Sequence, residues 1–237
     1  MQKTSDKAVC SSVVALQGIF AKIEKAATES NRSFSDITLV VVSKKFDVPE
    51  ILPLLQAGHR HFGENRVQEA QAKWSALRFD FPDIKLHLIG PLQSNKAAEA
   101  VQFFDVIETV DREKIAVILA QEISKQNRCP QLYVQVNTGR EPQKAGISPQ
   151  DAVAFIRHYK SSYHLNIEGL MCIPPAGENP GPHFALLEQI GREANLTRFS
   201  MGMSRDFETA IAFGATNVRI GSAILGHRDD PGQPRRL

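Results

Sequence analysis

The chain has 237 residues and a formal net charge of +2, from 28 lysines and arginines and 26 aspartates and glutamates. With charges this evenly balanced, composition gives no reason to expect nucleic acid or a membrane surface as a partner. No apolar stretch approaches the roughly 18 residues of a transmembrane helix, and the first residues lead into no signal-peptide core, so we expect a cytoplasmic protein.

The first predicted element is a long amphipathic helix over residues 8–30. Its apolar side chains recur at helical spacing, which predicts a helix packed against the body of the protein. These side chains are Val9, Val13, Leu16, Ile19, Phe20, Ile23 and Ala27. After this helix, short apolar runs alternate with helical segments for the rest of the chain.

The alternation predicts a parallel sheet with a helix after each strand. The expected strands are residues 39–43, 60–62, 85–89, 105–108, 132–136, 167–171, 198–200 and 217–220. The expected helices are residues 48–57, 65–77, a segment after Gln93, 111–125, 148–159, 182–194 and 204–213, with Asp111 and Ser204 as N-caps.

Eight such strands in a chain of this length predict a single (β/α)8 TIM barrel. The barrel would form one domain over residues 1–237, with its core at about residues 36–227. A doubly wound open sheet is the alternative, because periodicity does not distinguish the two. The cysteines Cys10, Cys129 and Cys172 form no paired framework and show no metal-ligand spacing, which fits reduced thiols and predicts no metal site.

Lys44 is the first candidate functional residue. It ends the apolar run of residues 39–42, which reads as a strand buried on both faces. Active sites of α/β folds lie at the carboxyl ends of such strands. A partly desolvated amine at this position acts as a nucleophile toward an aldehyde. A solvated lysine that merely follows a strand is the plainer alternative.

Two glycine-containing segments follow the last two predicted strands. Residues 200–204 (SMGMS) precede a predicted helix, and residues 219–226 (RIGSAILG) contain the final strand end. Backbone N–H groups at glycine turns and helix N-termini, with serine hydroxyls, bind phosphate. The loops after strands seven and eight are the usual phosphate site of a barrel, although helix capping alone would explain either segment.

A lysine that reacts with aldehydes and a phosphate site suggest pyridoxal 5'-phosphate (PLP), whose aldehyde would form an imine with Lys44. Arg219 fits the same cofactor. A guanidinium beside the pyridine nitrogen keeps that nitrogen unprotonated, because two adjacent positive charges are unfavourable. A structural ion pair is the alternative role for Arg219.

Several segments together resemble the pyridoxal phosphate homeostasis protein family, which is similar to the N-terminal barrel of alanine racemase. They are residues 42–44 (VSK), 61–69 (HFGENRVQE), 87–96 (HLIGPLQSNK), 135–137 (QVN), 144–146 (KAG), 169–171 (GLM), 200–204 (SMGMS) and 218–221 (VRIG). The resemblance extends over residues 39–226, and this combination of segments in this order is highly specific.

The resemblance implies PLP as the cofactor, with Lys44 as the imine-forming lysine and Arg219 as the partner of the pyridine nitrogen. It also implies phosphate contacts from Ser200, Met201, Gly202, Gly221 and Ser222, and a cofactor pocket lined by Asn65. His87, Gly90 and Asn137 are expected to point toward the same mouth by their positions at strand ends, with structural packing as an equal alternative.

The chain departs from the family pattern at three positions. Arg66 replaces a common tyrosine, Ser222 replaces a common threonine, and Leu225 replaces a frequent phenylalanine. The serine keeps the hydroxyl and the leucine changes only packing, whereas a basic residue at position 66 could alter ligand access.

Three functions remain open on the sequence. The first is a non-catalytic PLP carrier in vitamin B6 homeostasis, monomeric, with PLP-dependent apoenzymes as recipients. The second is a single-domain PLP-dependent racemase-type enzyme, which the chain disfavours because it has no second domain to supply a tyrosine base and no tyrosine after a predicted strand. The third is an aldolase-type barrel in which Lys44 attacks a phosphorylated substrate.

Overall fold

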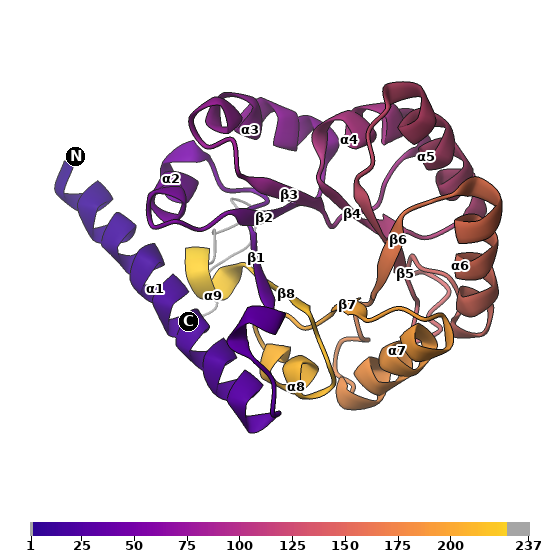
Figure 1. Ribbon diagram of the computed structural model, residues 1–237. Helices are drawn as coiled ribbons and strands as arrows, with labels where there is room; N and C mark the ends of the chain where they lie inside the picture. The colour runs from indigo at the N-terminus through magenta and orange to yellow at the C-terminus, as the bar shows by residue number, and fades with distance from the viewer. Residues whose placement is uncertain (1, 227–237) are drawn as a thin grey trace.

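The computed structural model describes residues 2–226, with side chains from residue 11 onward. Parallel strands form a closed barrel in chain order, and helices surround it (Figure 1). The strands are β1 (Thr38–Val42), β2 (His61–Glu64), β3 (Lys85–Leu88), β4 (Val106–Val110), β5 (Gln131–Gln135), β6 (Ile167–Met171), β7 (Arg198–Ser200) and β8 (Asn217–Ile220).

One helix of the outer ring follows each of these strands. These helices are α2 (Val48–Gln56), α3 (Val67–Asp80), α4 (Ala97–Phe103), α5 (Glu113–Gln126), α6 (Pro149–Tyr163), α7 (Gly181–Glu193), α8 (Phe207–Ala212) and α9 (Ser222–Leu225). The 3-10 turns η1 (Phe34–Asp36) and η2 (Ser94–Lys96) precede β1 and α4. In the described part of the chain, no helix is long and apolar enough to cross a membrane.

The pairing of β1 with β8 closes the barrel and decides between the two predicted architectures. Thr38 lies opposite Asn217, and Val40 lies opposite Arg219, in parallel register. An open sheet would leave these two strands as separate edges, so the (β/α)8 barrel is confirmed and the doubly wound alternative is wrong.

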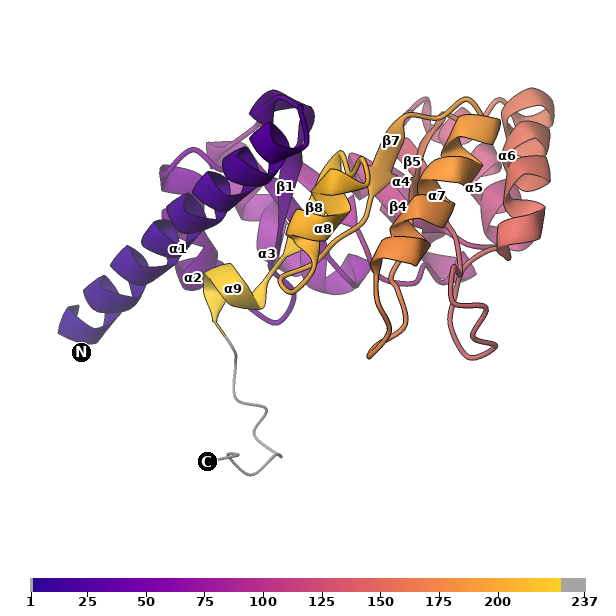
Figure 2. The ribbon, with the colours of Figure 1, turned by 90° about the horizontal axis from the view of Figure 1, so that it is seen from below.

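The predicted amphipathic helix is α1 (Gln2–Glu29), which runs obliquely along the outside of the barrel (Figure 2). It packs against α2, α8 and α9. Leu16, Ile19, Ile23 and Ala27 are buried in this contact, as their spacing predicts. The side chains of Val9 and Cys10 lie outside the described residues.

Most helix boundaries agree with prediction, but two N-caps do not. The α5 helix begins at Glu113 with Arg112 at the N-cap position, and Asp111 instead forms an ion pair with Arg112. The α8 helix begins at Phe207 after Asp206, and Ser204 lies in the preceding turn. Asp206 accepts a hydrogen bond from the Met203 N–H at 2.6 Å, and this bond closes that turn ahead of the helix.

The barrel has an apolar exterior and a partly polar interior. Outward-facing strand residues such as Leu39, Val41 and Phe62 join the helices in one large core. Inside, Val106, Tyr133 and Met171 form a small separate cluster. The rest of the interior holds polar side chains that are almost completely buried, among them His87, Glu108, Ser200, Asn217 and Arg219. Such groups require hydrogen-bonded partners, and their partners define the functional site.

Candidate functional site at the carboxyl-terminal mouth of the barrel

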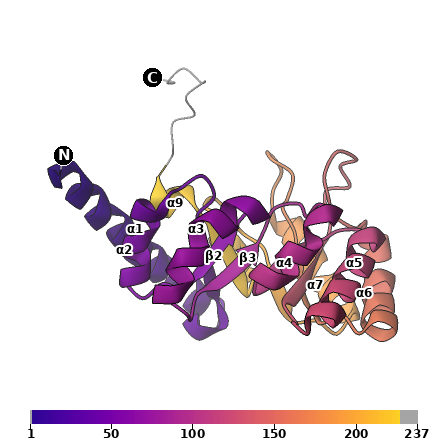
Figure 3. The same cartoon turned by 90° about the horizontal axis from the view of Figure 1, so that it is seen from above.

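The long loops after β5 and β6 project from one end of the barrel, at the same end as α9 (Figure 3). This end is the carboxyl-terminal mouth, where the chain leaves each strand. The two long loops touch there, because a Cβ added at Gly139 would lie 2.3 Å from Pro175 Cγ. Lys44, Asn65 and Ser222 all lie at this mouth, as the sequence predicts for residues that follow strands.

Lys44 lies in a tight turn that follows β1. The turn is closed by a hydrogen bond from the Phe46 N–H to the Ser43 carbonyl at 3.1 Å. The Lys44 side chain is solvent-exposed. Lys45 follows with a positive φ of 67°, an uncommon conformation for a residue with a side chain, which turns the chain away after the lysine.

A buried carboxylate fixes the backbone that carries Lys44. Glu64 Oε1 accepts hydrogen bonds from Ser43 Oγ at 2.8 Å, Lys73 Nζ at 2.8 Å and Trp74 Nε1 at 3.0 Å. Lys73 Nζ also donates to the Ser43 carbonyl at 2.8 Å. Charge-assisted bonds of this kind are among the stronger ones in proteins, so the residue before Lys44 is held in place from two sides.

Arg219 lies on the floor of the mouth and is only 4% exposed. Its guanidinium donates through NH1 to Ser200 Oγ at 2.6 Å and through NH2 to the Cys172 carbonyl at 2.9 Å. Because Cys172 directly follows β6, the guanidinium extends across the barrel from β8. Burial raises the pKa of the Cys172 thiol to about 12, so this cysteine stays protonated.

Arg219 is the end of a hydrogen-bonded chain that crosses the barrel interior. Ser200 Oγ donates to Glu108 Oε2 at 2.6 Å, and Glu108 Oε1 accepts from His87 Nδ1 at 2.8 Å. His87 Nε2 lies 3.2 Å from His61 Nδ1. Burial alone would raise the pKa of Glu108, but bonds to His87 and Ser200 and the charges of His87 and Arg219 lower it below its ordinary value.

His87 lies deeper than predicted. It is 2% exposed, bonds to Glu108, and borders a cavity at the amino-terminal end of the barrel. The expectation that it points toward the mouth is therefore wrong. Its position in the middle of β3, paired with Gly63 and Val106, places the imidazole one layer below the strand ends.

The predicted phosphate-binding residues divide into two groups. Gly202, Gly221 and Ser222 follow β7 and β8 at the mouth, and Ser222 and Ala223 open α9, so their N–H groups have no intrahelical acceptor. Ser200 and Met201 lie below. The Ser200 hydroxyl is engaged by Glu108 and Arg219, whereas Met201 is buried in the outer core and its N–H donates to the Asn217 carbonyl at 3.1 Å.

Gly90 supports Asn65 rather than facing the mouth. A Cβ at Gly90 would lie 2.3 Å from the Asn65 carbonyl oxygen and 2.7 Å from Asn65 Cα. The Gly90 carbonyl accepts a bond from Thr109 Oγ1 at 2.8 Å, which fixes this contact from the other side. Asn137 also has a structural role, because its side chain bonds to the backbone of Glu141 on both its oxygen and its nitrogen.

We therefore expect Gly90→Ala to lower the free energy of unfolding by about 3 kcal/mol or more, because backbone atoms cannot move away from the added methyl group. Urea denaturation measures this change. Gly18→Ala is the matched control: Gly18 is exposed within α1 with open space around it, so alanine should stabilise the protein by about 0.5–1 kcal/mol. Equal effects of the two substitutions would contradict this account of Gly90.

Arg66, which stands where the family commonly has tyrosine, lies beside a cavity of about 680 Å³ between the loops after β2, β3 and β4. Arg66 is the N-cap residue of α3, and its exposed guanidinium pairs with Glu69 at 3.1 Å. The cavity is also lined by Asn65, Gln68, Gln93, Lys96 and Arg112. Arg66 thus adds positive charge at the edge of the mouth next to Asn65.

Two histidines near β2 make stability depend on pH. Burial lowers the pKa of His59 and of His61 from 6.5 to about 4. Since the unfolded chain binds these protons more readily, stability is fully present above about pH 6.5 and falls as the pH drops toward about 4. We expect His59→Gln to reduce the loss of unfolding free energy between neutral and acidic pH by about 2–3 kcal/mol, as measured by urea denaturation at several pH values. His164→Asn, at an exposed position, should leave the profile unchanged.

Comparison with known proteins identifies the family of the chain. The alanine racemase N-terminal domain family matches residues 15–229. The pyridoxal phosphate homeostasis protein of Vibrio cholerae is 38% identical over 224 residues, which cover 90% of this chain and 95% of the relative. The protein of the same name from Pseudomonas aeruginosa is 40% identical over 220 residues, covering 89% of this chain and 93% of the relative. The chain belongs to the pyridoxal phosphate homeostasis protein family.

Solved structures agree with membership of the pyridoxal phosphate homeostasis protein family. PipY of Synechococcus elongatus with PLP bound is 38% identical, with a TM-score of 0.75, and covers 86% of this chain and 100% of PipY. Alanine racemase of Clostridium difficile is 14% identical, with a TM-score of 0.70, and matches 93% of this chain but 58% of the racemase. At this identity the racemase shares the fold alone.

Proposed function

We propose that this protein holds PLP at the carboxyl-terminal mouth through a reversible covalent bond to Lys44 and takes part in intracellular PLP homeostasis. One observation carries the proposal: the exposed amine of Lys44 and the buried guanidinium of Arg219 lie at the same mouth on neighbouring strands, β1 and β8. PLP offers an aldehyde to the amine, a ring nitrogen to the guanidinium and a phosphate to the loops after β7 and β8.

The donor set fits this cofactor. Asn65, Gly202, Gly221 and Ser222 are the further cofactor-binding residues at the mouth, and Ser200 positions Arg219 from below. Bound PLP supplies an aldehyde and a conjugated ring that withdraws electrons. Arg219 favours the unprotonated ring nitrogen, because its permanent positive charge opposes a second one beside it. This arrangement makes the ring a weaker electron sink and favours holding over catalysis.

Among the residues that the structure describes, the candidate second bases are engaged elsewhere, which supports a carrier without efficient catalysis. A racemase needs proton-transferring groups on both faces of the ring. The chain has three tyrosines: Tyr133 lies inside the barrel, and Tyr159 and Tyr163 stack on each other on α6. His87 is engaged by Glu108 away from the mouth, and Lys144 is held in an ion pair with Glu141 at 2.5 Å.

The proposed carrier acts in the cytoplasm as a monomer and passes PLP to PLP-dependent apoenzymes. Light scattering coupled to gel filtration tests the monomer. Mixing the loaded protein with a PLP-dependent apoenzyme tests delivery. We expect the loaded protein to restore more enzyme activity than free PLP does at the same concentration.

An absorption titration of the purified protein with PLP tests the function itself. We expect a saturable visible band distinct from that of free PLP. A protein with no such band would rule out the PLP proposal and favour the aldolase-type alternative, in which Lys44 attacks a different phosphorylated carbonyl compound.

Incubation of the loaded protein with single L-amino acids separates carrier from enzyme. We expect no D-isomer above the amount formed by PLP alone, measured by chiral chromatography. Sustained turnover would instead establish the racemase-type alternative while leaving PLP binding intact.

A further inference from the structure

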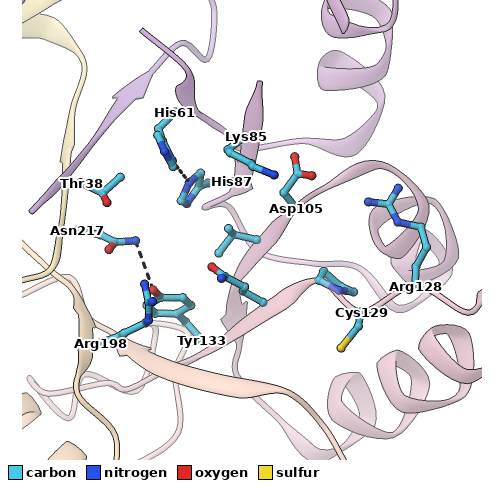
Figure 4. A pocket seen from close by; sticks show the side chains of 13 residues that line it. Thr38, His61, Lys85, His87, Asp105, Arg128, Cys129, Tyr133, Arg198 and Asn217 are labelled. Carbon is cyan, nitrogen blue, oxygen red and sulfur yellow. Dashed lines mark hydrogen bonds between the residues drawn. The ribbon is translucent and has the colours of Figure 1, made fainter. Parts of the chain in front are cut away.

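A second cavity, of about 380 Å³, lies at the amino-terminal end of the barrel, opposite the proposed PLP site (Figure 4). The first residues of seven strands line it: Thr38, His61, Lys85, Val106, Gln131, Arg198 and Asn217. We propose that this cavity is a binding site for a small organic dianion, a dicarboxylate or a phosphate ester, whose binding is coupled to uptake of a proton by His61.

Positive charge predominates around the cavity. Its lining includes Lys85, Arg128 and Arg198 against a single carboxylate, Asp105. Asp105 Oδ2 is already engaged by Arg78 at 2.5 Å and by the Leu86 N–H at 2.9 Å. A concave surface lined by one sign of charge concentrates counter-ions.

Two of the cations have no carboxylate partner. Arg198 is balanced by Glu168 at 3.5 Å. Among the described residues, by contrast, no carboxylate lies within ion-pair distance of Lys85 or Arg128, and the only hydrogen bond of the Arg128 guanidinium is to the Gln102 carbonyl. Two unpaired cations beside one small cavity match the charge of a dianion.

The inner wall of the cavity is formed by buried polar side chains. His87, Tyr133 and Asn217 are 2%, 1% and 4% exposed. Asn217 Nδ2 lies 3.5 Å from the Tyr133 hydroxyl (Figure 4). Burial and the charge of Glu108 raise the pKa of Tyr133 to about 12, so its hydroxyl keeps its proton. Buried polar groups at a cavity wall give a small ligand directional contacts that an open surface lacks.

The contact between the imidazoles of His61 and His87 explains why anion binding would lead to proton uptake at His61. His87 Nδ1 lies 2.8 Å from Glu108 Oε1, and His87 Nε2 lies 3.2 Å from His61 Nδ1, so both ring nitrogens of His87 and one of His61 are engaged within the protein. Nε2 is the nitrogen of His61 that is left for a ligand. An anion at this nitrogen favours its protonation, which supplies both a donor and a third positive charge.

The surroundings of His61 oppose protonation while the cavity holds no anion. Burial and the positive charges of His87, His59 and Lys85 lower its pKa to about 4. The other titratable groups at the cavity are Asp105, Arg128, Arg198, Cys129 and Tyr133, and the remaining polar ones are Thr38, Gln131 and Asn217. A dianion among these cations offsets their repulsion, so anion binding and protonation of His61 should strengthen each other.

Calorimetry on the protein without PLP tests the site, which makes the result independent of the proposed function. Malonate and inorganic phosphate are titrated separately, with sodium chloride at matched ionic strength, in buffers of different ionisation enthalpy. With affinities expressed for the dianion of each ligand, because phosphate itself takes up a proton in this range, we expect saturable binding with proton uptake by the protein and at least about fivefold tightening between pH 7.5 and pH 6. Tighter binding of malonate would indicate a dicarboxylate ligand, and tighter binding of phosphate would indicate a phosphate ester.

Three variants locate the binding. Lys85→Gln combined with Arg128→Gln should weaken it at least about tenfold, whereas Lys125→Gln, 75% exposed on α5, should not change it. His61→Gln keeps a donor toward His87, so it should retain binding but lose the proton uptake. Heats no greater than those of chloride, or equal binding by the double variant, would overturn the proposal.

Discussion

Lys44→Ala is expected to abolish the covalent attachment of PLP to residue 44 and to leave the fold intact. Lys44 supplies the amine that bonds to the aldehyde, and alanine has no nucleophile to replace it. The side chain is solvent-exposed, so its removal should change the free energy of unfolding by no more than about 0.5 kcal/mol. Borohydride reduction of the PLP-loaded protein, followed by peptide mapping with mass spectrometry, measures attachment at each lysine.

Lys125→Ala is the matched control for Lys44→Ala, because Lys125 is an exposed lysine in the last turn of α5, at the end of the barrel opposite the mouth. It should leave both the visible band and the mass increase at the Lys44 peptide unchanged. A wild-type protein that carries the reduced adduct on other lysines but not on Lys44 would contradict the assignment. Loss of the fold in Lys44→Ala, detected by circular dichroism, would show that the lysine is structural instead.

The fold was largely predictable because its strands are short apolar runs that recur between amphipathic segments. Every predicted strand is present, with boundaries that agree or differ by at most two residues. The alternation could not distinguish a closed barrel from an open sheet, since both bury parallel strands between helices. The pairing of Val40 with Arg219 is a contact between distant parts of the sequence, and periodicity carries no information about it.

The positions of the site residues along the chain could be predicted from the sequence, but the layer of the barrel in which each side chain lies could not. Residues after strands lie at the mouth, which correctly places Lys44, Asn65 and Ser222. Alternation along a strand gives the face of a side chain and not its layer within the barrel. For that reason His87 was expected at the mouth, although it lies beside the opposite cavity.

The buried carboxylates were missed, although each leaves a signal in the sequence. Glu108 interrupts the apolar run of β4, and Glu64 ends β2, and both are fully buried. A carboxylate within a strand that is otherwise apolar indicates a buried partner, since charged groups are almost never fully buried unless paired. The identity of the partners, Arg219 for one and Lys73 for the other, depends on packing that the sequence alone does not reveal.

Glu108→Ala is expected to lower the free energy of unfolding by about 3–5 kcal/mol, the typical cost of removing one partner of a buried ion pair. The change would leave Arg219, whose NH1 is 3.8 Å from Glu108 Oε2, as an uncompensated buried charge. His87 Nδ1 and the Ser200 hydroxyl would also lose their acceptor. Urea denaturation near neutral pH measures the loss.

Glu108→Gln removes the negative charge of this side chain but keeps its shape, so it tests how the free energy of unfolding depends on pH through that charge. Because the folded pKa of Glu108 is lowered, its carboxylate stabilises the protein fully above its ordinary pKa of 4.5, and this contribution declines as the pH falls further. The stability gap between wild type and Glu108→Gln should therefore be constant at neutral pH and narrow below about pH 4.5. Glu29→Gln, at an exposed ion pair with Lys25, should show no such gap. A gap that stays constant into acid would mean that Glu108 acts through its shape and not through its charge on Arg219.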